Sequence, residues 1–489
     1  MFIANKTSPL FILIFSALLI LDHTTLFSQP LKNRLNGDDE REQLRGVWIA
    51  TAYGIDWPKT YDPEKQKESL QEIFHDIKKK NLNAVFFQVR IRGDVLFYSP
   101  YEPFSNVLTG SLGVIPDYDP VAYAISLAKE NGLEFHAWFN TMILNGKNST
   151  PQSEGVAHIW QAHPEWIDKR ARKNAWQKTA YLNPALPEVR AHLIRLITDF
   201  AERYDIDGIQ LDDYLRYPTK DFPDDEEFEK YNPKKLSLDD WRRENINQFV
   251  GDLYDSLMQR KPYLKFGVTP IGVYTRVDDV PAMESYHDVY QDSREWVRRK
   301  KCDYLAPQIY FHTGKTTAAD RRKNKTNPPF ENLVRDWGGN MPFRHLYVGI
   351  GMYKPPIKEE WPHQVELAEK AGAEGVIFYP YHAIEDIPLL FKTQARVPQM
   401  KWKSLLDPAP PAKLSCEKSG DKAIIRWDVS DDIRWVNLYK LNFSIKRPFL
   451  HRLWGKEVQL QLQPGEVIFM TAVDRYGNES KPSMPILAP

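Results

Sequence analysis

Short apolar runs alternate with amphipathic stretches from residue 45 onward, and this alternation constrains the fold more than any other feature of the sequence. Eight runs have the length and composition of buried strands, namely 45–50, 84–90, 134–140, 208–214, 266–270, 303–310, 346–351 and 375–381. Between them, helical patterns cover 64–80, 120–130, 188–204, 239–260, 286–300, 330–337 and 362–371. Eight strands, each followed by a crossover helix, predict an α/β fold of the (β/α)8 TIM barrel type. A GxGxxG or P-loop motif, which would favour an open doubly wound sheet, does not occur.

The pattern changes after residue 400. The Pro-rich segment 401–413 is expected to be a linker between the barrel, over 41–400, and a second domain over 414–489. In this second domain, short strands without helical period are predicted at 423–427, 434–441, 457–462 and 466–474. The strand residue Trp427 and the run 471–480 resemble a fibronectin type III module. We therefore expect a small all-β sandwich with a structural role.

The N-terminus has the pattern of a secretory signal peptide. Lys6 supplies a positive charge, and the apolar run 10–21 is too short to span a bilayer comfortably. We expect cleavage after Ser28, which defines a signal peptide over 1–28 and a short N-terminal extension over 29–40. The mature protein is then exported to the periplasm or the extracellular space without stable membrane insertion; an uncleaved membrane anchor is the alternative.

Composition excludes several functions. The 65 Lys and Arg residues balance 65 Asp and Glu residues, so the chain offers no basic surface for nucleic acid. Its 2 cysteines, Cys302 and Cys416, are expected to be free, packed thiols. The sequence lacks CxxC and HExxH motifs, and we expect neither a metal site nor a cofactor.

Alternation along the predicted strands selects the side chains that face the barrel interior. Asp212 lies at the carboxyl end of its strand, where TIM barrels carry their catalytic carboxylates. A buried carboxylate without a partner costs several kcal/mol, so a structural role would require a cation such as Arg90 or Arg216. His136 lies deeper in its strand and is expected to be a hydrogen-bonded core group.

Aromatic and polar side chains predicted around Asp212 suggest a sugar-binding site, because aromatic faces stack on pyranose rings while amides and charged groups bind hydroxyls. Glycoside hydrolysis needs a second carboxyl group, for which Asp213, Asp94 and Glu102 are the candidates. A polysaccharide would be the substrate. The residues expected to bind it are Trp48, Gln88, Arg90, Trp138, Asn140, Tyr214, Arg216, Gln308, Tyr310, Tyr379 and Tyr381.

Seven motifs, in order within roughly 41–400, resemble the glycosyl-hydrolase-like family 10, which is distinct from the xylanases that share its number. They lie at 45–58, 86–110, 118–140, 181–190, 205–218, 286–297 and 303–310. The resemblance implies a (β/α)8 barrel, bacterial export and glycoside hydrolase activity, with members linked to peptidoglycan glycan strands stripped of their stem peptides. The site positions it implies are Arg90, Asp94, Trp138, Asn140, Asp212, Asp213, Gln308 and Tyr310. Ile91 departs from the family, which commonly has Pro there; this affects loop stiffness.

Basic residues near the predicted barrel mouth bear on the substrate. Arg90, Arg92 and Arg216 could bind the lactyl carboxylate of muramic acid, an anion that neutral glucans and chitin lack. The basic run 320–325 could do the same, although a solvated loop is the more ordinary role for it. The acidic run 224–229 is expected to be solvated surface rather than a calcium site. A hydrolase of peptidoglycan-type strands is the favoured interpretation; a hydrolase of another polysaccharide and a non-catalytic glycan-binding barrel are the alternatives.

Overall fold

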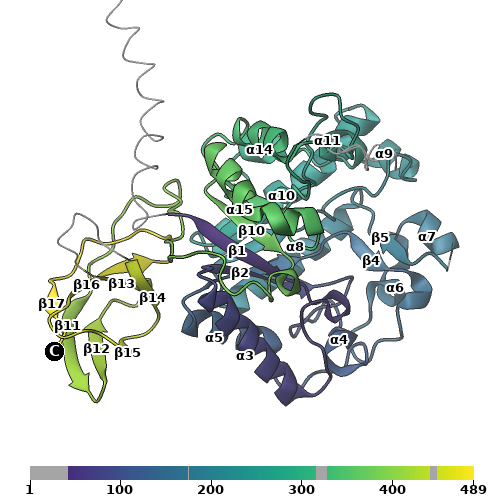
Figure 1. The fold of residues 1–489 in the computed structure, drawn as a ribbon. Helices are drawn as coiled ribbons and strands as arrows, with labels where there is room; N and C mark the ends of the chain where they lie inside the picture. Colours follow the sequence, from purple (N-terminus) through teal and green to yellow (C-terminus); the bar gives the residue numbers. More distant parts are fainter. Residues whose placement is uncertain (1–41, 175, 315–327, 441–448) are drawn as a thin grey trace, which may run out of the picture.

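A closed barrel of eight parallel strands forms the centre of the protein, as predicted. The computed structural model describes residues 42–174, 176–314, 328–440 and 449–489 (Figure 1). The predicted signal peptide, the N-terminal extension and the basic run 320–325 lie outside the described residues. The strands, in their order around the barrel, are β1 (Leu44–Ile49), β2 (Ala84–Arg90), β3 (Glu134–Phe139), β6 (Gly208–Leu211), β7 (Lys265–Val268), β8 (Tyr304–Leu305), β9 (His345–Gly351) and β10 (Gly375–Tyr379), which pairs with β1.

Helices connect successive strands, and several begin with a capping residue followed by proline. Asp62 and Asp119 cap α3 and α5, where each carboxylate accepts hydrogen bonds from two backbone N–H groups. The predicted helix 286–300 is instead two short helices, and the predicted helix 362–371 begins seven residues earlier, at Pro355. The helices are α3 (Pro63–Lys79), α5 (Pro120–Glu130), α8 (Pro187–Arg203), α10 (Leu238–Arg260), α11 (Ser285–Asp288), α12 (Ser293–Arg298), α14 (Phe330–Gly338) and α15 (Pro355–Lys370).

The barrel interior contains aromatic and polar side chains, whereas the layer between strands and helices is apolar. Phe86, Tyr304 and Tyr347 fill the interior. His136 is fully buried, with Nδ1 3.0 Å from the Tyr304 hydroxyl and Nε2 3.4 Å from Glu134, which is the core role expected for it. The strand alternation therefore sorts side chains as predicted.

The chain between β3 and α8 forms a lobe that the sequence patterns do not predict (Figure 1). Its hairpin pairs β4 (Ile143–Asn145) with β5 (Thr179–Tyr181) in antiparallel fashion. Because β4 follows the carboxyl end of β3, the lobe stands at the mouth of the barrel. Its remaining elements are η2 (Lys147–Ser149), α6 (Ile159–Ala162), η3 (Pro164–Trp166) and α7 (Lys169–Lys173).

Short elements also occupy other loops at the mouth: η1 (Ala52–Gly54), α4 (Asn106–Thr109), α9 (Asp225–Tyr231) and η4 (Tyr381–Ala383). The acidic run 224–229 is only partly solvated. Asp224 is fully buried and accepts a 3.0 Å hydrogen bond from Arg242 Nε, so the expectation of a solvated surface is wrong for this residue. A buried carboxylate of this kind is tolerated because a guanidinium neutralises it.

The C-terminal region consists of two small antiparallel sheets packed around Trp427, Leu438 and Met470. The four predicted strands are present, and β11 begins at Ala412, inside the segment expected to be linker. One sheet contains β11 (Ala412–Ser419), β12 (Lys422–Asp428) and β15 (Glu457–Leu460). The other contains β14 (Phe449–Leu453), β13 (Ile433–Lys440), β16 (Val467–Asp474) and β17 (Ile486–Leu487). Both cysteines are free, as expected.

This C-terminal module packs against the amino-terminal end of the barrel, opposite the mouth. Arg434 binds Asp207 through Nε at 2.8 Å and Asp205 through Nη1 at 2.7 Å, and its side chain is 4% exposed. Arg475 Nη1 also binds Asp205, at 2.6 Å. Both aspartates immediately precede β6. The module therefore leaves the mouth open for a ligand.

Candidate active site

Asp212 follows β6 and is buried at the barrel mouth, with 2% of its surface exposed. Its Oδ1 accepts a 3.1 Å hydrogen bond from the backbone N–H of Tyr214, whereas Oδ2 has no hydrogen-bond partner in the described part of the chain. Burial and, secondarily, the charge of Asp213 raise the pKa of Asp212 well above its ordinary value. Asp212 therefore keeps its proton to a higher pH than an exposed aspartate does.

Asp213 occupies a contrasting environment. Its Oδ1 accepts a 2.9 Å hydrogen bond from Gln308 Nε2, and its Oδ2 lies 3.2 Å from Arg216 Nη1. Gln291 donates a 2.7 Å hydrogen bond to the backbone carbonyl of Asp213 and thereby fixes the turn. The adjacent carboxyl groups therefore differ: Asp212 is buried and forms no ion pair with a described residue, whereas Asp213 is paired with Arg216 and is 21% exposed. Such divergence is the pattern that separates an acid from a base.

Aromatic rings form one wall of the mouth. Tyr310 and Tyr379 stack with centroids 5.7 Å apart and an interplanar angle of 9°. Tyr353 packs edge-on against both, at 5.9 and 6.0 Å, and is 48% exposed. Trp48 and Trp138 approach Tyr379 at 6.1 and 6.4 Å. Sequence reasoning missed Tyr353, although an aromatic residue just past the end of β9 is a usable signal.

The segment that contains Gln308 and Tyr310 contacts both this wall and the carboxylates. Burial, with added contributions from Asp56, Asp213 and Asp212, raises the pKa of Tyr379 to about 12. Gln308 donates a 2.9 Å hydrogen bond to Asp213 Oδ1, and Tyr310, two residues further along the chain, stacks on Tyr379. The aromatic wall and the aspartate pair therefore belong to one site.

The predicted amide side chains Gln88 and Asn140 are hydrogen-bonded to each other. Gln88 Oε1 accepts hydrogen bonds from the backbone N–H groups of Thr51 and Ala52 at 2.9 and 2.8 Å, and its Nε2 donates to Asn140 Oδ1 at 3.1 Å. Gln88 thus supports the end of β1 and orients Asn140. The hydrogen bond from Gln88 occupies Oδ1 of Asn140, while its Nδ2 group donates to no described residue.

Arg90 and Glu102 do not serve as predicted. Arg90 Nε and Nη2 donate to the two carboxylate oxygens of Glu102, each at 2.8 Å, and both side chains are fully buried. His192 Nε2 lies 3.2 Å from the same carboxylate. Although burial alone raises the pKa of Glu102, the charge of Arg90 and the hydrogen bonds of His192 and Arg90 lower it to about 2. The expectations of a catalytic Glu102 and a substrate-binding Arg90 are therefore wrong, because this buried pair has no group left for substrate.

Tyr381 is also wrongly predicted to face the interior. β10 ends at Tyr379, and the chain turns into η4, so the strand alternation stops before Tyr381. The Tyr381 side chain is 5% exposed, and its hydroxyl donates to Asp76 Oδ2 of α3 at 3.0 Å. Asp94 is likewise buried, and its Oδ1 accepts a 2.9 Å hydrogen bond from the backbone N–H of Arg92 within its own loop. Of the predicted carboxylates, Asp212 and Asp213 are brought together.

Tyr214 and Arg216 line the side of the mouth next to the lobe. The Arg216 guanidinium lies 5.1 Å from the Tyr214 ring centroid, and Tyr181 of the lobe approaches Tyr214 at 6.4 Å. Trp48, which is predicted to bind substrate, lies in the barrel interior, where its Nε1 donates to Gln210 Oε1. Within the described ranges, no cluster of three His, Cys, Asp or Glu side chains could hold a metal ion, and no helix is long and apolar enough to cross a membrane.

Comparison with known proteins assigns this chain to a family. A family model described as glycosyl hydrolase-like 10 matches residues 43–354, a range that includes both aspartates and Tyr353. The chain belongs to this family. Glycosyl hydrolase YngK of Bacillus subtilis is 31% identical over 495 residues, covering 92% of this chain and 94% of the relative. Glycosyl hydrolase DigH of Escherichia coli is 30% identical over 351 residues, covering 65% and 76%.

Two solved structures are similar to this glycosyl hydrolase-like chain at low sequence identity. The PgaB (BpsB) glycoside hydrolase domain from Bordetella bronchiseptica has a TM-score of 0.47 at 14% identity, covering 72% of this chain and 100% of that one. The catalytic domain of β-amylase from Paenibacillus polymyxa has a TM-score of 0.49 at 12% identity, covering 71% and 94%.

Proposed function

We propose that this protein is a glycoside hydrolase in which Asp212 is the general acid and Asp213 the second carboxylate. The contrast between the two adjacent aspartates carries this proposal. Burial raises the pKa of Asp212, which favours its protonated form, and its Oδ2 has no hydrogen-bond partner among the described residues, so this carboxyl group suits donation to a glycosidic oxygen. Asp213 is held beside Arg216 and supplies negative charge to an oxocarbenium-like transition state.

The chemistry then runs in two parts. The proton of Asp212 passes to the leaving oxygen as the bond from that oxygen to the anomeric carbon breaks. Asp213 acts by one of two routes. In the first it bonds to the anomeric carbon, and water then breaks this bond while Asp212 takes the proton of the water; in the second it takes a proton from a water that attacks the anomeric carbon directly. The anomeric configuration of the first product distinguishes these routes, since the two successive displacements through Asp213 retain the configuration overall and a single attack by water inverts it.

The proposed substrate is the glycan strand of peptidoglycan after removal of its stem peptides. Stacked Tyr310 and Tyr379 offer aromatic faces to sugar rings, and Asn140 offers a donor to hydroxyls. Arg92 makes no ion pair with any described residue and lies 5.5 Å from the Tyr53 ring centroid, so its guanidinium is available to a lactyl carboxylate. The signal-peptide pattern at 1–28 supports export to the compartment that contains this polymer.

Mass spectrometry of digestion products tests the proposal. The protein is incubated with intact peptidoglycan and with the same material stripped of stem peptides by an amidase. We expect disaccharide-repeat oligomers from the stripped strands, none with Asp212→Asn, and unchanged release with Asp255→Asn, a matched change on the outer helix α10. Release of oligomers by Asp212→Asn at the normal rate would exclude Asp212 as the acid.

Two other outcomes identify the alternatives. Cleavage of a different polysaccharide, with both peptidoglycan samples intact, would keep the chemistry and replace the substrate. Stripped strands that bind equally well to Asp212→Asn and to the unchanged protein, with no product from any glycan, would show a glycan-binding barrel without catalysis. The glycan-binding alternative follows from the small number of carboxylates at the mouth. Of the predicted catalytic carboxylates, the structure brings together Asp212 and Asp213, so a hydrolase would depend on these two.

A further inference from the structure

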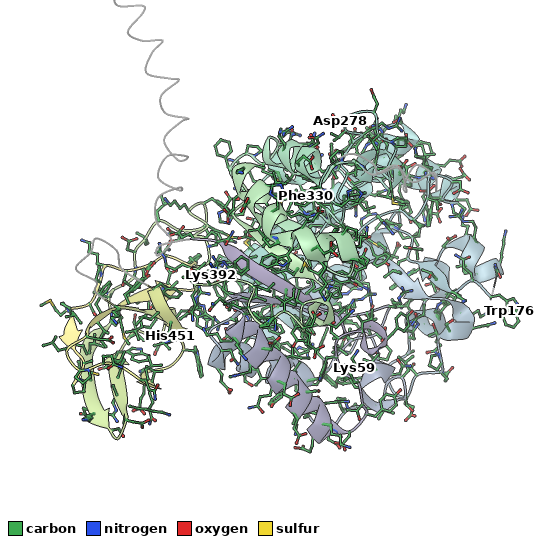
Figure 2. All side chains as sticks on the ribbon, viewed as in Figure 1. Lys59, Trp176, Asp278, Phe330, Lys392 and His451 are labelled. Carbon is green, nitrogen blue, oxygen red and sulfur yellow. The ribbon has the colours of Figure 1, made fainter. Side chains whose placement is uncertain are left out.

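The outer end of the lobe gathers exposed basic side chains around one tryptophan. We call this surface the lobe tip and define it as Lys147, Arg172, Lys173, Trp176 and Lys178. All five side chains are exposed, and Trp176 is 85% exposed. Figure 2 shows Trp176 at the edge of the molecule, on the side away from the C-terminal module.

Local backbone geometry brings these residues together. The β4–β5 hairpin ends where the Gly146 N–H donates to the Lys178 carbonyl at 2.9 Å, which places Lys147 beside Lys178. Helix α7 ends at Lys173, and the Asn174 side chain accepts a 3.2 Å hydrogen bond from the backbone N–H of Trp176. The lobe tip is therefore a folded turn rather than an extended arm.

The charges of the lobe tip are uncompensated, unlike those of its neighbours. Lys169 and Arg170 on the same short helix bind Glu226, at 3.2 Å, and Asp221, at 3.1 Å, in the loop after β6. By contrast, none of the four cations of the lobe tip forms an ion pair with a described residue. The chain as a whole has 65 residues of each sign, so this is a local positive excess.

The hairpin joins the lobe tip to the candidate active site. Tyr181 lies 6.4 Å from Tyr214 at the mouth, and Lys178 is three residues away along β5, which is about 10 Å. The same hairpin is tied to another loop at the mouth, because the Tyr53 hydroxyl donates to Asn145 Oδ1 at 3.2 Å. A polymer that leaves the mouth along this hairpin would reach the lobe tip.

We propose that the lobe tip is an accessory site for an anionic glycan, occupied by the part of the strand that extends beyond the sugars at the mouth. Trp176 stacks on a sugar ring, and the lysine and arginine side chains pair with carboxylates on the strand. The identity of this ligand rests on the proposed function. Trp176 is the single apolar side chain among the five residues of the lobe tip, so the apolar area is too small for insertion into a lipid surface, which requires a broad apolar face.

Binding of size-fractionated, amidase-stripped glycan strands tests the inference. Titrations use the full-length Asp212→Asn protein, so that cleavage does not interfere, and compare it with Asp212→Asn carrying either Trp176→Ala or Arg172→Glu with Lys173→Glu. We expect the double charge reversal to raise the Kd for long strands about tenfold, since each exposed ion pair contributes up to about fivefold. High salt should reduce this difference.

Matched controls define the result. Lys418→Glu with Lys422→Glu reverses two exposed charges on the C-terminal module and should leave every Kd unchanged. Single disaccharide units, which fill only the mouth, should bind all variants equally. Equal Kd values for long strands, or an equal loss for single disaccharides, would overturn the inference. Loss of binding to anionic phospholipid vesicles with unchanged glycan affinity would overturn it in favour of a lipid surface.

The experiment also separates this inference from the proposed function. If the unchanged protein cleaves none of the glycans but the lobe-tip variants bind long strands more weakly, the hydrolase proposal fails and the accessory site stands. If the unchanged protein cleaves stripped strands, and the lobe-tip substitutions made in the protein with Asp212 intact leave kcat/KM unchanged on both long and short strands, the hydrolase proposal stands and the accessory site fails.

Discussion

Replacement of Asp212 by Asn should make the protein more stable above pH 4 while it abolishes turnover. The side chain is 2% exposed, its pKa is raised well above the ordinary value by burial and then by Asp213, and Asn keeps nearly the same shape without a titratable group. Loss of a general acid reduces turnover by about 10²–10⁴-fold. The stability change is the sharper test, because it reports the protonation of Asp212 directly.

Its size follows from proton linkage. An unfolded aspartate titrates near pH 3.9, whereas folded Asp212 titrates at a higher pH. Between these two values the folded protein holds a proton that the unfolded chain has released, so the contribution of Asp212 to stability falls by about 1.4 kcal/mol per pH unit. The contribution is complete below the unfolded pKa and is lost as pH rises through the folded pKa. Asp212→Asn has no such loss.

Urea unfolding of both proteins at unit steps from pH 4 to pH 8 measures the effect. The free energy of unfolding of Asp212→Asn, minus that of the unchanged protein, should rise with pH and then level off at the folded pKa of Asp212. In an Asp213→Asn background the plateau should begin at lower pH, because one of the causes of the raised pKa is removed. A difference that stays constant over this range would refute the reasoning.

Three further outcomes are expected. Glu102→Gln leaves Arg90 buried without its counter-ion and should lower the free energy of unfolding by about 3–5 kcal/mol in urea titrations; a loss of turnover at unchanged stability would contradict the structural role. Tyr310→Ala removes one of the stacked rings and should raise KM for oligomers about tenfold at little cost in kcat, as steady-state kinetics would show; an unchanged KM would count against sugar stacking. Arg434→Ala removes a buried guanidinium between module and barrel and should cost about 3 kcal/mol or more, whereas Arg426→Ala, an exposed ion pair, should cost less than about 1 kcal/mol; similar urea midpoints for both would argue against the docking contact.

Much of the barrel is predictable because the signals that define it are local. Apolar strand runs, helical periodicity and the Asp-Pro starts at Asp62 and Asp119 depend only on neighbouring residues. Alternation also places Asp212 correctly, because it is the first residue after a regular strand. The same rule fails for Tyr381, since it applies only as far as the strand itself extends.

Other features depend on contacts between distant segments. Arg90 and Glu102 meet because their loop folds back on β2, with Val95 bridged to both Arg90 and Phe104, and no periodic pattern encodes that turn. The lobe escapes prediction because its helices and strands are too short to show a period. The different environments of Asp212 and Asp213 arise because Arg216 and Gln308 bind Asp213 directly, whereas Asp212 is buried without an ion pair to a described residue.

The C-terminal module is bound to the strand that precedes the candidate acid. Arg434 binds Asp205 and Asp207 at the entry to β6, and Asp207 Oδ2 also accepts a 2.9 Å hydrogen bond from the Phe135 N–H in the neighbouring strand. Asp212 follows the other end of β6, five residues on and about 17 Å away. The four-residue strand β6 therefore has the Arg434 contact with the module at one end and the candidate acid at the other. Truncation before residue 412 would remove the contacts of Arg434 with Asp205 and Asp207 at the start of β6. We therefore expect the loss of the module to lower turnover as well as stability.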